Sequence, residues 1–124
     1  MTRIAPNDPE AWLAAGEGRH ARRDLEGARA AYGIALRFRP RWGRALMDLG
    51  NLDSDTGDFA GASRNYLAAE AAGVRKPSLD RNLGFAYLRL GDAANAQARL
   101  ERYAAATGDP SIAPLLARIQ QEGR

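Results

Sequence analysis

The sequence predicts an all-α, right-handed superhelical solenoid, and three observations predict it. The 124-residue chain repeats itself at a fixed offset of 34 residues. Its apolar residues are mostly alanine and leucine, with few valines and isoleucines, which favours helix over strand. Small residues recur at matching places, and these are Gly16, Gly50 and Gly84, then Ala28, Ala62 and Ala96. A unit of this length cannot bury its apolar side alone, so consecutive units are expected to stack.

The first helix pair begins after Asp8, an N-cap residue that is followed by a proline at the first helical position. Its first helix is predicted from about Pro9 to Arg22. Asp24 caps a second helix, which should end before Pro40, because a proline ring cannot continue a helix. The first unit is therefore one antiparallel helix-turn-helix, over about residues 9–42.

Two further copies follow without insertion or deletion, over about 43–76 and 77–110. Gly73 and Gly108 are expected to end their second helices. Within each unit the small residues mark the place where the two helices cross closely, since only glycine or alanine lets the backbones approach. The larger residues that should fill the space opposite are Tyr32, Tyr66 and Leu100.

A seventh helix is predicted over about 111–122. Leu115, Leu116 and Ile119 fall on one face of an otherwise polar segment. This face should cover the apolar side that the last helix pair would otherwise expose, as a capping helix does in a solenoid.

Composition excludes several kinds of site. The chain has no cysteine, and His20 is the only histidine, so thiolate and multi-histidine metal sites are excluded. No serine stands in a nucleophile-elbow context. We expect no enzymatic activity, no cofactor and no metal. No segment approaches the roughly 18 to 20 apolar residues that span a bilayer, and residues 1–10 are polar, so the sequence favours a cytoplasmic protein without membrane insertion.

The repeated residues resemble the tetratricopeptide repeat. Its pattern is matched in the first unit by Trp12, Gly16, Ala28, Tyr32, Ala35 and Pro40, in the second by Leu46, Leu49, Gly50, Gly57, Phe59, Ala62, Tyr66 and Ala69, and in the third by Leu83, Gly84, Tyr87, Gly91 and Ala96. Arg19 and Asp53 replace bulky residues, which should loosen packing around the first helices of units one and two. Tyr103 replaces a small residue and could pack on the terminal helix.

The resemblance implies a concave groove lined by the first helix of each unit, in which a peptide or protein segment binds. Carrying this geometry over residue by residue places the following side chains in the groove: Leu13, Glu17 and His20 from unit one, Arg44, Met47, Asp48 and Asn51 from unit two, and Arg81, Asn82, Phe85 and Arg89 from unit three. The same geometry also places Glu10 of unit one and Asp55 of unit two in the groove. Leu13, Met47 and Phe85 would be apolar anchors, while the asparagines would bond a peptide backbone.

One branch of the family grips the C-terminal carboxylate of chaperones with lysine, asparagine and arginine. The corresponding positions hold Leu13, Glu17, Asp48, Ser78 and Asn82. The cationic clamp is therefore missing, and the two carboxylates would repel an acidic chaperone tail.

Two alternatives to an isolated scaffold remain open. Residues 4–8 read like the tail of a preceding unit, so the chain could be a module of a larger protein. Residues 1–44 carry nine basic and five acidic residues and residues 45–92 five and seven, so copies could pair end to end. Nucleic-acid binding is disfavoured, because the arginines near the start alternate with Asp24 and Glu26 and no aromatic platform accompanies them.

Overall fold

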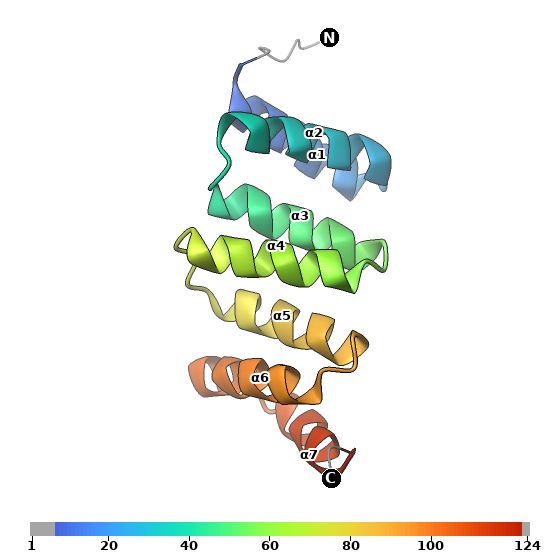
Figure 1. Cartoon of the computed structure of the whole chain (residues 1–124), viewed down its shortest axis with the longest axis vertical. Coiled ribbons are helices and arrows are strands. Elements are labelled where there is room, and N and C mark those ends of the chain that lie inside the picture. Colours follow the sequence, from blue (N-terminus) through green and yellow to red (C-terminus); the bar gives the residue numbers. More distant parts are fainter. Residues whose placement is uncertain (1–6, 123–124) are drawn as a thin grey trace.

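The computed structural model describes residues 7–122, so most of the segment that resembles a preceding unit, residues 4–8, lies outside the described residues. Within the described part the chain forms seven helices and no strand. They are α1 (Pro9–Ala21), α2 (Leu25–Phe38), α3 (Gly43–Asp55), α4 (Phe59–Ala71), α5 (Pro77–Arg89), α6 (Ala93–Thr107) and α7 (Ile112–Glu122). Figure 1 shows them stacked in chain order along the long axis of the molecule.

The helices pack most extensively as consecutive pairs, α1 with α2, α3 with α4 and α5 with α6. Neighbouring pairs meet through α2 with α3 and α4 with α5, and α7 packs on α6. The first helices also touch one another, α1 with α3 and α3 with α5. The predicted all-α solenoid is confirmed.

At each of the three glycines where two paired helices cross, the predicted large side chain fills the space opposite. At Gly50 a Cβ atom would lie 2.7 Å from the ring of Tyr66, closer than atoms pack. Glycine is therefore required there to bring α3 and α4 together. The same relation holds in all three pairs, at Gly16 with Tyr32, at Gly50 with Tyr66 and at Gly84 with Leu100.

The predicted N-caps Asp8 and Asp24 begin α1 and α2, and the predicted Gly108 ends α6. The N-cap aspartates whose side chains accept backbone N–H bonds are Asp8, Asp24, Asp58 and Asp92, at α1, α2, α4 and α6. Between paired helices the chain takes the left-handed conformation at Gly57 and Gly91, with φ of 84° and 79°. At the equivalent position of the first pair Arg23 does so with φ of 66°, which costs a residue with a side chain more than it costs glycine.

The terminal helix covers the last pair, as predicted. Ile112 and Ile119 of α7 are buried against Leu100 and Tyr103 of α6, and Leu115 and Leu116 are partly buried beside them. The Tyr103 hydroxyl donates to Asp109 Oδ2 at 2.8 Å, just before α7. The tyrosine that replaces a small residue thus positions the terminal helix.

Asp53 does not leave loose packing where the family has a bulky side chain. It is 2% exposed, accepts a 2.6 Å hydrogen bond from Asn65 Nδ2, and lies 2.8 Å from Arg29 Nη1. Arg19 similarly donates to the Gly27 carbonyl at 3.1 Å. Polar contacts between α1, α2, α3 and α4 therefore replace the apolar ones, and the expected looseness is absent around Asp53.

None of the seven helices described in residues 7–122 has the length and apolar character needed to cross a membrane.

Candidate binding groove

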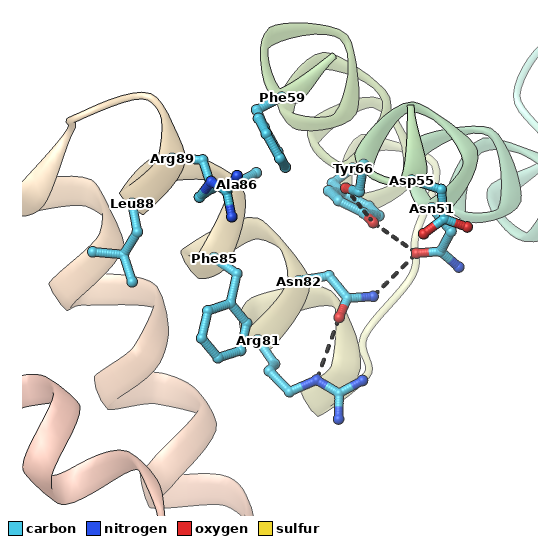
Figure 2. A pocket seen from close by; sticks show the side chains of 11 residues that line it. Asn51, Asp55, Phe59, Tyr66, Arg81, Asn82, Phe85, Ala86, Leu88 and Arg89 are labelled. Carbon is cyan, nitrogen blue, oxygen red and sulfur yellow. Dashed lines mark hydrogen bonds between the residues drawn. The ribbon is translucent and has the colours of Figure 1, made fainter. Parts of the chain in front are cut away.

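A cavity of about 560 Å³ opens between α3, α4 and α5. Figure 2 shows its walls. The lining residues are Asn51, Ser54 and Asp55 of α3, Phe59 and Tyr66 of α4, and Arg81, Asn82, Phe85, Ala86, Leu88 and Arg89 of α5. This cavity lies between the second and third helix pairs, on the face formed by the first helices.

The apolar part of the cavity centres on Phe85, whose exposed fraction is 41%. Phe59 and Leu88 are partly buried beside the core and add apolar surface. The Arg89 guanidinium lies over the Phe59 ring, 4.8 Å from its centroid. An aromatic ring left open in a concave site is suited to anchoring an apolar side chain of a partner.

An amide network fixes the polar wall (Figure 2). The Tyr66 hydroxyl donates to Asn51 Oδ1 at 2.6 Å, and Asn82 Nδ2 donates to the same oxygen at 3.2 Å. Arg81 Nε in turn donates to Asn82 Oδ1 at 3.3 Å. The two bonds that Asn51 Oδ1 accepts fix the orientation of the Asn51 amide. Its Nδ2 group then has no acceptor among residues 7–122. It is available to donate to a ligand carbonyl.

A second, shallower hollow lies beside the first, between α1 and α3, and is lined by Glu17, His20, Tyr32, Asp48 and Asp55 among others. His20 bridges the helices, with Nε2 2.6 Å from Asp55 Oδ2 and Nδ1 3.3 Å from the Tyr32 hydroxyl. Its contacts join α1, α2 and α3, which is a structural role.

Glu17 and Asp48 bring two carboxyl groups together in this hollow. Arg44 holds Glu17 through two hydrogen bonds of 2.8 and 3.2 Å. Burial, and then the neighbouring Glu17, raise the pKa of Asp48 to about 8. Asp48 is thus largely protonated at neutral pH, because two adjacent carboxylates in a partly buried site cannot both ionise freely. Burial, followed by the charges of Asp48 and Glu17, also raises the pKa of Tyr32.

Ten predicted groove residues lie in or beside these two hollows. Asn51, Arg81, Asn82, Phe85 and Arg89 line the cavity. Glu17, His20 and Asp48 line the shallower hollow, and Arg44 contacts it through Glu17. Asp55 lines both, while Glu10 lies 3.5 Å from Arg39 at an exposed site.

The prediction that Leu13 and Met47 line the groove is wrong. Leu13 is 1% exposed and packs with Tyr32 and with Ala45 of α3, while Met47 is 8% exposed and packs with Leu79 of α5. Both lie on the flank of a first helix, where the next first helix covers them. Phe85 is therefore the one of the three predicted anchors that remains open.

Sequence reasoning missed the contribution of the second helices to the cavity. Tyr66 was identified as a core filler, yet its hydroxyl reaches Asn51 at the groove wall. A tyrosine with a buried ring needs a hydrogen-bond partner for its hydroxyl, and this was the available signal. Phe59 gave no such signal, since its position in the repeat pattern accounts for it equally well.

Comparison with known proteins gives the fold. Neither the models of protein families nor the curated proteins match the sequence. Among solved structures, YrrB, a TPR protein with an unusual peptide-binding site, is 21% identical, with a TM-score of 0.82 over 89% of this chain. The match covers 57% of the YrrB chain. The first TPR of Spaghetti (RPAP3), bound to an HSP90 peptide, is 15% identical, with a TM-score of 0.83 over 98% of both chains.

A third structure is the Yersinia enterocolitica chaperone SycD in complex with a peptide of the translocator YopD. It is 16% identical, with a TM-score of 0.75 over 97% of this chain and 92% of that chain. These likenesses show that the chain has the tetratricopeptide-repeat fold.

Proposed function

We propose that this chain is a scaffold that binds an extended segment of another protein in the cavity between α3 and α5. The observation that carries the proposal is that an exposed aromatic ring, Phe85, and the Asn51 amide, whose Nδ2 has no acceptor among residues 7–122, line one open cavity. The ring can bury an apolar side chain, and the amide can bond the backbone of a partner.

The compared structures support this choice of ligand. The chains of Spaghetti and SycD were solved with bound peptides, and YrrB is described by its peptide-binding site. All three have the fold of this chain. We propose that this chain binds its partner and catalyses no reaction. A cytoplasmic location stays an expectation from the sequence.

The proposal takes the chain as three repeats, about 9–42, 43–76 and 77–110, with a capping helix over about 111–122. The packing of the helices as consecutive pairs supports these bounds.

If the chain is a module of a larger protein, it would bind its partner in the same groove. End-to-end pairing of copies has less support, because basic residues near the start are already paired within the chain, as Arg29 is with Asp53 and Arg44 with Glu17.

The proposal is tested by selecting peptides from a random displayed library on the wild-type chain and measuring their affinities by fluorescence anisotropy. Phe85→Glu places a charge in the apolar anchor site and should weaken binding by at least about tenfold. The matched control is Leu67→Glu, on α4 outside the cavity, where the side chain is 38% exposed. Failure to select any peptide, or equal loss in both variants, would overturn the proposal.

A further inference from the structure

We infer that the cavity selects a segment that carries acidic side chains next to an apolar side chain. This inference rests on the proposed function and specifies its ligand. It starts from the two arginines at the cavity, Arg81 and Arg89, neither of which has a carboxylate within ion-pair distance among residues 7–122. By contrast, the partly buried Arg99 holds Glu70 and Asp80 together.

The two arginines flank the aromatic anchor. Arg81 lies four residues before Phe85 and Arg89 four residues after it, so all three share one face of α5. Over eight residues of helix, the Cα atoms of the two arginines are separated by about 12 Å along the axis. An extended peptide advances about 3.3–3.6 Å per residue, so a ligand with acidic residues beside an apolar residue can meet both cations and the ring.

Aromatic and amide contacts hold both guanidinium groups in place. The Arg89 guanidinium lies over the Phe59 ring, 4.8 Å from its centroid. Arg81 lies 6.0 Å from the Tyr103 ring centroid, and its Nε donates to Asn82 Oδ1. A guanidinium group that contacts a ring through its face keeps N–H groups at its edge for a carboxylate. These contacts reduce the entropy lost when a ligand carboxylate binds.

The cations of the cavity lie on α5, whereas its acidic side chain lies on α3. The single acidic residue that lines the cavity, within the described part of the chain, is Asp55, and it lies 2.6 Å from His20 and 3.5 Å from Arg23. Acidic ligand residues should therefore bind over α5, where the two arginines lie.

The test uses the full chain and three synthetic peptides with acetylated and amidated ends, so that side chains supply the only charges. Each peptide has a central Leu-Phe pair flanked on both sides by aspartate, by asparagine or by lysine. Binding by the wild-type chain should weaken from aspartate to asparagine to lysine, by at least about fivefold at each step. The differences should shrink as salt is added.

The decisive variant is the double substitution Arg81→Gln with Arg89→Gln, in which the aspartate and asparagine peptides should bind within about twofold of each other. The control, Arg37→Gln with Arg64→Gln, makes the same change in net charge at exposed positions outside the cavity and should keep the preference. A preference that persists in the decisive variant, or that is missing from the wild type, overturns the inference.

The outcomes separate this inference from the proposed function. If the wild-type chain binds the aspartate and asparagine peptides equally, and Phe85→Glu abolishes both interactions, the groove binds peptides but does not select acidic ones. If none of the three peptides binds, both the acidic preference and the proposed use of the cavity are contradicted.

Discussion

At the scale of single residues, the Glu17–Asp48 pair makes the stability of the protein depend on pH. The pKa of Asp48 is about 8 in the folded chain and 3.8 as an ordinary carboxyl group. Between these values the native state keeps a proton that the unfolded chain has lost. Stability therefore falls as pH rises, because the free energy of unfolding decreases wherever the native state binds more protons. The contribution is complete below about pH 4 and is lost by about pH 8.

Asp48→Asn removes this titration. We expect the variant to match the wild type near pH 4 and to be more stable by about 1–2 kcal/mol at pH 8, a value reduced for partial access of water to the carboxyl group. Urea unfolding across this pH range measures the difference. The control is Glu26→Gln, an exposed position without an ion pair in the described structure, and it should show no such trend. A difference for Asp48→Asn that stays constant from pH 4 to pH 8 would contradict the assignment.

The glycines at the crossings give a second prediction at this scale. In Gly50→Ala the new Cβ would lie 2.7 Å from the Tyr66 ring, which is 1% exposed and has no room to move. We expect the free energy of unfolding to fall by about 2–3 kcal/mol. This loss exceeds the stabilisation that the higher helix propensity of alanine would give. Gly33→Ala, with nothing within 4 Å of the new atom, should instead gain about 0.5–1 kcal/mol. Equal stability of the two variants would show that the crossing is not close-packed.

At the scale of the element, α7 shows how the stack is closed. Its Ile119 is 5% exposed and belongs to the cluster with Leu100 and Tyr103. Without this cover the apolar side of α6 would face water, and a solenoid end of that kind tends to associate.

Ile119→Asp tests this role of α7. A carboxylate in the apolar contact should cost about 2–4 kcal/mol in the free energy of unfolding and should raise the average mass seen in sedimentation. Gln120→Asp introduces the same charge one residue later, at an exposed site, and should change neither quantity. If Ile119→Asp unfolds at the wild-type urea concentration and stays monomeric, α7 is not the cover that the packing indicates.

At the scale of the whole molecule, polar contacts join one helix pair to the next. Asp53 of α3 contacts Arg29 of α2, and Arg99 of α6 contacts Glu70 of α4 as well as Asp80 of α5. The bond to Arg99 holds the pKa of Glu70 below its ordinary value. In an array whose units contact only their neighbours, such contacts determine how cooperatively the units unfold.

Arg99→Ala removes the cation that holds the partly buried Glu70, and leaves Asp80 with the longer contact to Arg102 Nε at 3.6 Å. It should cost about 1–3 kcal/mol. Both tryptophans, Trp12 and Trp42, lie in the first helix pair and its junction, so fluorescence reports that end while circular dichroism reports all helices. In the variant, the loss of helicity should have its midpoint at a lower urea concentration than the fluorescence change. In the wild type the two unfolding transitions should coincide.

The control for this prediction is Arg118→Ala, which removes an ion pair of 3.9 Å between side chains that are each 74% exposed. It should cost less than about 0.5 kcal/mol and keep the two transitions together. Coincident transitions in Arg99→Ala would mean that this network does not link the second pair to the third.

The sequence by itself determined the helices, their caps, the glycine crossings and the cover supplied by α7. These features depend on residues close in the chain or at a fixed 34-residue offset, where propensity, capping and spacing act locally. The resemblance to the tetratricopeptide repeat also implied that Phe85, Arg81 and Asn82 lie on the groove side of α5, and all three line the cavity.

Only the tertiary structure decided what happens at the edges of those faces. Met47 and Phe85 both stand on the predicted groove side, yet α5 covers Met47 and no helix described here covers Phe85. Likewise, Glu17 and Asp48 come together only because α1 and α3 pack side by side. A helical repeat fixes the direction of a side chain, whereas its burial and its partners depend on the distance and angle of the next helix, which no local pattern specifies.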